Sequence, residues 1–193
     1  MKPLKYSKSL VTFLSAFTNK NEKETKSEKY LFTKGIIYTS HSLIATNRRL
    51  LVEVETEGIP QEMMGKSYDV EGNLITDKVD MICLQMLTMK RRPEVYSFDV
   101  DKWDKAYKKI QKFERPKDAT KIAPEECINF DGKLIVRADY FDNVARVCRK
   151  YDIDQINYSP DSYIVKSESV QIIGVVYNDV YFDTKKVPEY KKL

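Results

Sequence analysis

The sequence predicts an α+β fold made of antiparallel strands and amphipathic helices. The prediction rests on three stretches in which an extended run leads directly into a helix with one apolar face, namely residues 4–17, 95–113 and 134–151. Runs rich in β-branched and aromatic residues follow the first and the last of these stretches. A strand, a helix and a strand meander therefore form a unit that the chain uses more than once.

The first helix is predicted at residues 7–17. Its apolar side chains recur at the i, i+3, i+4, i+7 spacing of one helix face, and Ser7 or Ser9 can serve as its N-cap.

Residues 19–29 are almost wholly polar and predict a solvated loop. Residues 30–40, 43–46 and 50–55 then predict three short antiparallel strands. Gly58 and Pro60 end this meander, and residues 69–74 predict the turn of a further hairpin.

Residues 79–89 are compatible with two structures. Val79, Ile82, Cys83, Met86 and Leu87 suit one face of a helix, but the run is also apolar enough for a buried strand. We favour irregular structure or a short helix. Pro93 then disfavours helix at the residue before it.

The second helix follows a strand predicted at residues 95–98. Asp99 or Asp101 can cap it, and its apolar face is predicted to comprise Val100, Trp103, Tyr107, Ile110 and Phe113. Two prolines and several charged residues make residues 114–126 a connector. We therefore expect an N-terminal part at 1–115 and a C-terminal part at 116–193, which can also form one continuous domain.

The third helix follows a hairpin at residues 127–136, whose Asp131-Gly132 turn is a strong hairpin signal. Asp139 is predicted to cap the helix, and Phe141, Val144, Cys148 and Tyr151 are predicted to face inward. Three strands should follow, at residues 153–158, 163–167 and 170–177. The basic tail at 185–193 is expected to fray.

Composition places the chain among globular proteins. Its 193 residues are 42% hydrophobic and 32% charged, and 33 basic side chains exceed 29 acidic ones by only +4, so a polyanion-binding surface must come from the placement of charges. Three widely spaced cysteines fit neither a disulfide framework nor a CxxC metal site. With no signal-like N-terminus and no long apolar run, we expect a cytoplasmic protein that does not enter a membrane.

No catalytic, cofactor or metal site is predicted. His41 lies in a Ser-His-Ser turn without an acid or a cysteine nearby in sequence, and the phosphate-loop, dinucleotide, zinc-protease and EF-hand motifs are all missing from the sequence. The aspartate pairs at 99 and 101 and at 152 and 154 are more typical of caps and turns than of Mg²⁺ sites. An enzyme is therefore the least favoured class.

The helices bear basic outer faces. Lys102, Lys105, Lys109 and Lys112 recur along one stripe of the second helix, and Arg146, Arg149 and Lys150 lie on the polar side of the third. Such rows of like charge repel one another unless a polyanion such as a phosphate backbone neutralises them. A solvated surface is the alternative, because Lys-rich outer faces are common.

Two segments resemble the DNA sliding clamps, the ring-shaped processivity factors of replicative polymerases. Residues 134–177 resemble the last clamp repeat, with a strand, the helix start Ala138-Asp139-Tyr140-Phe141 and three closing strands. Residues 30–55 resemble a clamp stretch in which a strand runs into an Ala-Thr-polar-x-Arg-Leu turn, here Ala45-Thr46-Asn47-Arg48-Arg49-Leu50. Together the two segments cover more than a third of the chain.

The resemblance implies a clamp-like fold of βαβββ repeats, with antiparallel sheets and helices on one face. It implies a non-enzymatic replication accessory factor that binds duplex DNA without sequence specificity, forms homo-oligomers and docks a DNA polymerase or another replication protein. The DNA-binding residues implied are Lys102, Lys105, Lys109, Lys112, Arg146, Arg149, Lys150 and Lys8, and Arg48 and Arg49 could also contact the backbone.

Only two well-formed repeats are recognisable. The chain is then either a minimal clamp that needs several copies to close a ring or a clamp-derived protein that no longer encircles DNA. An interaction module of the same fold that binds or inhibits a replication protein is the alternative function. The small size and the Lys, Asn and Tyr usage suit a phage or mobile element.

Overall fold

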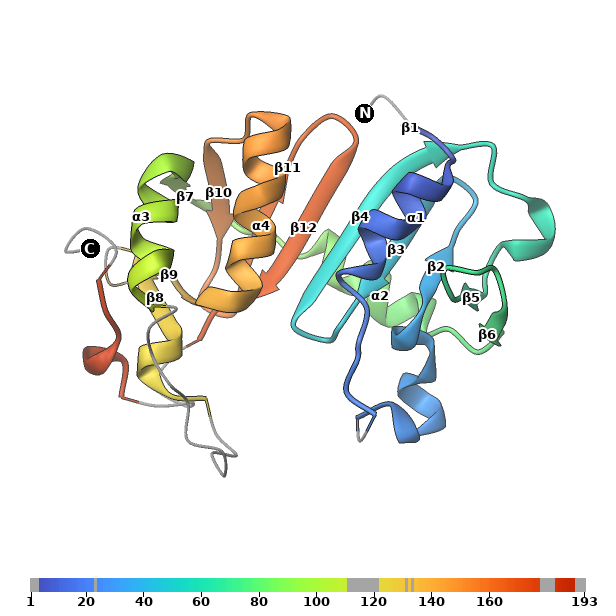
Figure 1. The fold of residues 1–193 in the computed structure, drawn as a ribbon, viewed down its shortest axis with the longest axis horizontal. Coiled ribbons are helices and arrows are strands. Elements are labelled where there is room, and N and C mark those ends of the chain that lie inside the picture. Colours follow the sequence, from blue (N-terminus) through green and yellow to red (C-terminus); the bar gives the residue numbers. More distant parts are fainter. Residues whose placement is uncertain are drawn as a thin grey trace. The chain divides into compact units, whose positions relative to one another are not determined.

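A computed structural model describes residues 4–22, 24–110, 122–130, 132, 134–177 and 183–189 (Figure 1). The chain divides into two compact units. The first comprises Met1–Lys90 and Lys166–Ile173, and the second comprises Arg91–Val165 and Gly174–Leu193. The α+β class predicted from the sequence is confirmed, whereas the division at residue 115 stays a prediction.

The first unit contains a mainly antiparallel sheet in the order β6-β5-β2-β3-β4, with β1 parallel to β4. Its elements are β1 (Leu4–Lys5), α1 (Lys8–Ser15), β2 (Ile36–Tyr38), β3 (Ser42–Thr46), β4 (Leu50–Glu57), β5 (Ser67–Tyr68), β6 (Leu74–Thr76) and α2 (Met81–Met89). Short 3₁₀ turns lie at Glu24–Lys26, Glu28–Lys34 and Gln61–Met63. The sheet order follows the chain from β2 to β4, as expected for a meander.

Alternation along β3 and β4 sorts the side chains of this sheet onto two faces. Leu43 pairs with Val54 and Ala45 pairs with Val52, and all four side chains are fully buried. Leu14 of α1 is also fully buried, and Figure 1 shows α1 lying over these strands. The apolar face of the sheet therefore packs against α1.

Helix α1 begins where the sequence predicts, with Ser7 as its N-cap, because the Ser7 hydroxyl accepts a hydrogen bond from the Leu10 backbone N–H. The predicted strand at residues 30–34 is wrong, since these residues form the 3₁₀ turn Glu28–Lys34. Two hydrogen bonds stabilise that turn: the Thr33 hydroxyl donates to the Tyr30 carbonyl, and the Thr33 carbonyl accepts from the Asn19 N–H. These contacts outweigh the strand preference of the aromatic and β-branched side chains.

The second unit contains two sets of paired strands and two helices. Its elements are β7 (Glu94–Ser97), α3 (Val100–Ile110), β8 (Cys127–Phe130), β9 (Leu134–Arg137), α4 (Ala138–Tyr151) and β10 (Gln155–Tyr158). β11 (Ser162–Lys166) belongs to this unit except for its last residue, while β12 (Val170–Val175) begins in the first unit and ends in the second. β10 pairs antiparallel with both β7 and β11, and β8 forms the predicted hairpin with β9. Short 3₁₀ turns occur at Pro124–Glu126 and Thr184–Lys186.

The chain contains two strand–helix–three-strand repeats, and the two repeats have matching backbone hydrogen bonds. The N–H of Thr39 donates to the Ser42 carbonyl at 2.9 Å, and the N–H of Ser159 donates to the Ser162 carbonyl at 2.8 Å. Two further pairs of bonds match in the same way: Asn47 to Leu50 with Ser167 to Val170, and Thr56 to His41 with Val176 to Asp161. In all three pairs, the residues of the second bond follow those of the first by the same number of positions in the sequence. The strand–helix–strands unit predicted from the sequence is thus used twice, as β1-α1-β2-β3-β4 and as β9-α4-β10-β11-β12.

Two other predictions about the helices need correction. Residues 81–89 form a helix, which is one of the two structures favoured, but the predicted inner face is wrong: Leu84 is the buried residue, and Ile82 and Met86 are exposed. Asp139 is not the N-cap of α4, because the helix begins one residue earlier and Asp139 lies within its first turn. In the described residues no helix is long and apolar enough to cross a membrane.

Candidate nucleic-acid interface

Helix α3 presents lysines on its solvent side. The Asp99 carboxylate caps the helix by accepting hydrogen bonds from the N–H groups of Asp101 and Lys102, and these bonds lower the pKa of Asp99. Trp103 and Ala106 are buried, whereas Lys102, Lys105 and Lys108 are exposed. The helix therefore has the orientation that its sequence pattern predicts.

Helix α4 has the same division between a buried and a basic face. Phe141, Val144 and Cys148 are buried as predicted, and Arg146, Arg149 and Lys150 are exposed. Asp152 ends the helix in a left-handed conformation with φ of 52°, and its N–H donates to the Cys148 carbonyl. Arg149 and Lys150 lie in the last turn, where cations also interact favourably with the helix dipole.

An aromatic cluster holds α3 and α4 side by side in the second unit (Figure 1). The Trp103 ring is fully buried, with its centroid 4.8 Å from that of Phe141 and 6.2 Å from that of Phe130. Its indole N–H donates to Asp142 Oδ1 at 3.3 Å. Buried rings of this size fix the spacing of the two helices, and hence of the cations on their outer sides.

Ion pairs connect three of the predicted DNA-binding residues to carboxylates. Arg146 Nη2 lies 2.7 Å from Asp142 Oδ2, and Arg149 Nη2 lies 2.7 Å from Asp104 Oδ2 of the neighbouring helix. Lys102 Nζ lies 3.5 Å from Asp99 Oδ2. The hydrogen bond to Asp104 raises the pKa of the Arg149 guanidinium. These acids reduce the positive potential of the surface but orient its guanidinium groups.

Lys105 and Lys108 differ from those three. Both are exposed on α3, and neither forms an ion pair with any residue that the structure describes. Lys150 is exposed at the end of α4, with its ammonium group 5.2 Å from the ring centre of Tyr151. Among the described residues of α3, Lys105 and Lys108 are thus the exposed lysines without an ion pair.

The remaining predicted residues lie elsewhere. Lys8 is exposed at the first residue of α1 in the first unit. Lys109 belongs to α3, but its side chain is outside the described part, and Lys112 falls in the undescribed segment 111–121. Arg48 and Arg49 form the turn between β3 and β4, where Arg48 has a φ of 69° and places its guanidinium 4.0 Å from the centre of the Tyr30 ring.

Sequence reasoning missed the acidic residues of this surface. The i, i+4 spacing of Asp142 and Arg146 could have predicted their ion pair. No sequence signal predicts the pair of Asp104 with Arg149, because it depends on how α3 and α4 pack. We name the exposed side chains Lys102, Lys105, Lys108, Arg146, Arg149 and Lys150 the basic helix surface.

Groups with catalytic potential are not assembled for chemistry in the described residues. His41 is exposed, and its Nδ1 lies 2.9 Å from the hydroxyl of the adjacent Ser40. Burial raises the pKa of the Cys127 and Cys148 thiols to about 12, so both remain protonated and unreactive at neutral pH. No group of three His, Cys, Asp or Glu side chains suited to a metal ion occurs in the part of the chain described.

Comparison with solved structures identifies the fold. The β sliding clamp of C. crescentus matches with a TM-score of 0.58 and 10% sequence identity, over 90% of this chain and 65% of that clamp. The DNA polymerase III β subunit of Borrelia burgdorferi matches 92% of this chain and 29% of its own, with 11% identity and a TM-score of 0.22. The β subunit of Streptococcus pyogenes DNA polymerase matches 96% and 33%, with 12% identity and a TM-score of 0.21.

The first match shows a clamp-like fold for this chain, which confirms the predicted fold class. The chain spans less than two thirds of that clamp's length. No protein-family model and no curated protein matches the sequence. The comparison therefore bears on the fold alone.

Proposed function

We propose that the chain is a clamp-like, non-enzymatic accessory factor of DNA replication in the cytoplasm, which binds duplex DNA without reading its sequence. The observation that supports this best is the basic helix surface. It occurs on two adjacent helices of a clamp-like fold and includes lysines that no described carboxylate neutralises.

The chemistry of this surface suits a phosphate backbone. Lysine ammonium groups act as point charges that release counterions from DNA, without any geometry that would distinguish bases. Arg146 and Arg149 each donate to one carboxylate and keep further N–H groups for phosphate oxygens. Binding should therefore depend strongly on salt and little on base sequence.

We further propose that several copies of the chain assemble around DNA. The chain matches only part of the C. crescentus clamp, and the repeats within it are built on the same hydrogen-bond pattern. A homo-oligomer would supply the additional repeats that a closed ring needs. Light scattering on the full chain tests this proposal, and a monomer at all concentrations, with or without DNA, would refute assembly.

A direct experiment compares variants of exposed lysines in duplex binding at low salt. Lys105→Glu should weaken binding severalfold, because it reverses a charge on α3. Lys166→Glu is the matched control, since Lys166 is also exposed but lies on β11. Two duplexes of unrelated sequence should bind equally well. Equal losses in the two variants, or a preference for one duplex, would contradict the proposal.

An interaction module that binds or inhibits a replication protein is the second candidate function. Helix α2 favours it, because Ile82, Met86 and Met89 are 72%, 70% and 81% exposed on one side of that helix. Apolar surface left in water is typical of a protein-binding site. On this alternative, Met86→Lys abolishes partner capture and Lys105→Glu does not.

A further inference from the structure

We propose that a cavity in the first unit binds the basic side chain, lysine or arginine, of another protein. This cavity has a volume of about 290 Å³ and lies between α2 and the strands β3 and β4. This volume is at the lower end of the range of small-molecule pockets, about 300–1,000 Å³, and leaves room for one long side chain. The proposal is independent of DNA binding by the basic helix surface.

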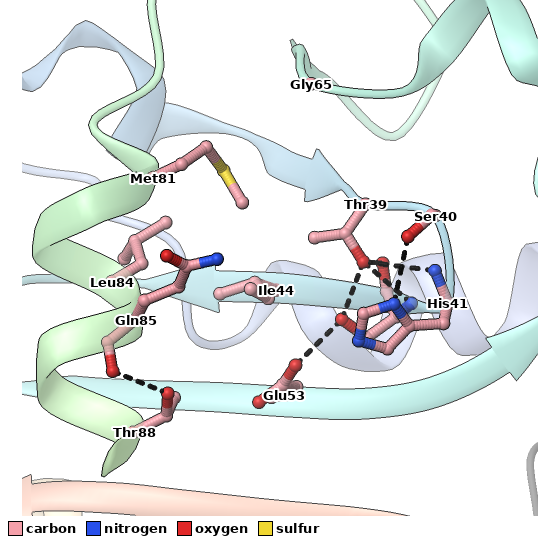
Figure 2. A pocket seen from close by; sticks show the side chains of 11 residues that line it. Thr39, Ser40, His41, Ile44, Glu53, Gly65, Met81, Leu84, Gln85 and Thr88 are labelled. Carbon is pink, nitrogen blue, oxygen red and sulfur yellow. Dashed lines mark hydrogen bonds between the residues drawn. The ribbon is translucent and has the colours of Figure 1, made fainter. Parts of the chain in front are cut away.

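Three apolar side chains line part of the cavity. Met81 and Leu84 of α2 form one side, and Ile44 of β3 lies opposite them. Figure 2 shows Met81 and Gln85 pointing from the helix toward the strands. These walls favour the aliphatic stem of a long side chain, which buries its methylene groups while its charged head reaches a polar group.

A carboxylate supplies that polar group. Glu53 of β4 lines the cavity and is half-buried, and no basic group that the structure describes lies within ion-pair distance of it. Its two oxygens accept hydrogen bonds from the Ser42 hydroxyl at 2.8 Å and from Gln171 Nε2 at 2.5 Å. Two neutral donors fix the carboxylate but leave its negative charge uncompensated.

The hydroxyl groups around Glu53 reinforce its role as an acceptor. The Ser42 hydroxyl donates its one hydrogen to Glu53. Thr39 Oγ1 accepts hydrogen bonds from the N–H groups of His41 and Ser42 (Figure 2). An ionised carboxylate has about four acceptor positions, of which two are used here. The two unused acceptor positions of Glu53 can take hydrogen bonds only from donors. The carboxylate therefore favours an ammonium or guanidinium group over an anion or an apolar group.

The probes for the test are side-chain analogues. n-Butylguanidinium carries the charge and stem of arginine, and n-butylurea has nearly the same shape without the charge. Titrated into the full chain with labelled methyl groups, n-butylguanidinium should shift the NMR signals of Ile44, Met81 and Leu84 saturably, and n-butylurea should bind at least tenfold more weakly. Equal affinities, or shifts spread over the surface, would overturn the proposal.

Two variants isolate the carboxylate and the cavity. Glu53→Gln should remove the preference for the charged probe, whereas Glu57→Gln, on an exposed residue of the same strand, should not. Gln85→Lys provides a second test on an exposed helix position that should not affect folding. Its ammonium group can occupy the cavity, so the variant should no longer bind the probe. Unchanged binding in both Glu53→Gln and Gln85→Lys would refute the assignment.

A final titration distinguishes a protein side chain from a free amine. Nα-acetyl-arginine amide carries the same head group together with its main chain. If a side chain from a protein is the natural occupant, this blocked residue should bind within about threefold of n-butylguanidinium. Binding of n-butylguanidinium without binding of the blocked arginine would contradict a protein partner.

Discussion

Asp142 Oδ2 lies 2.7 Å from Arg146 Nη2, and this ion pair joins the buried core of the second unit to its surface. The second carboxylate oxygen accepts a hydrogen bond from the indole of Trp103, whose ring is fully buried. Asp142 therefore connects the buried Trp103 ring to the exposed Arg146 guanidinium. It positions this cation without any contribution from a ligand.

Replacing Asp142 should destabilise the second unit. Asp142→Ala leaves the buried Trp103 indole without its acceptor, and a lost partner of a buried donor costs about 1–3 kcal/mol. Asp142→Asn retains an acceptor and should cost less. Urea unfolding followed by the fluorescence of Trp103, the one tryptophan, measures both variants. Equal unfolding free energies for wild type and Asp142→Ala would show that the indole bond contributes nothing.

Removing Asp104 should strengthen DNA binding. Asp104→Asn deletes the carboxylate that lies 2.7 Å from Arg149, so more positive charge becomes available to phosphate. Both side chains are about half exposed, and such pairs contribute little to stability. Fluorescence anisotropy with a labelled duplex should show tighter binding, with an unchanged melting temperature. Weaker binding would mean that Arg149 needs Asp104 for its orientation.

Gly174 should not tolerate a side chain. A Cβ at this position would lie 2.2 Å from a ring carbon of Tyr163, which is itself buried. Overpacking of this kind costs about 1–3 kcal/mol. In a Tyr163→Leu background, the same Gly174→Ala change should cost less, because the ring is gone. Additive losses in denaturant unfolding would place the cause outside this contact.

The three cysteines should differ in reactivity. Cys83 is exposed, whereas burial raises the pKa of Cys127 and Cys148 to about 12. At mildly alkaline pH, mass spectrometry after alkylation should find one modified thiol in the folded chain and three in urea. Fast modification of Cys148 in the native protein would contradict its burial.

The same thiols make stability depend on pH. In the unfolded chain they ionise at about pH 8.5, and in the folded chain they remain protonated up to about pH 12. Their contribution to stability is complete below the unfolded pKa and decreases as pH rises through this window. A Cys127→Ala/Cys148→Ala variant should therefore lose less stability than wild type between these pH values, as measured by urea unfolding.

Local patterns in the sequence were enough to predict much of the fold. Ser7 and Asp99 cap α1 and α3 as predicted, and the spacing of Phe141, Val144 and Cys148 gives the buried face of α4 correctly. These features depend on contacts within a few residues. The strand–helix units could be predicted for the same reason.

The sequence-based predictions were wrong or incomplete where contacts between residues far apart in sequence determine which side chains are buried or paired. Helix α2 has almost no polar residues, so its pattern could not indicate that Leu84 would be buried and Met86 exposed. Likewise, the ion pair of Arg149 with Asp104 and the position of Glu53 beside α2 join residues far apart in sequence. The candidate cations could be predicted from the sequence, but the acidic partner of Arg149 on the neighbouring helix could not.

The salt dependence of duplex binding tests the central claim most directly. For each phosphate contact, the logarithm of the affinity falls with the logarithm of salt concentration by a slope of about 0.9. The variant Lys105→Gln/Lys108→Gln/Lys150→Gln removes three exposed cations from α3 and α4. We expect its slope to be shallower than that of wild type by roughly 2–3. An identical slope would contradict DNA binding by these helices.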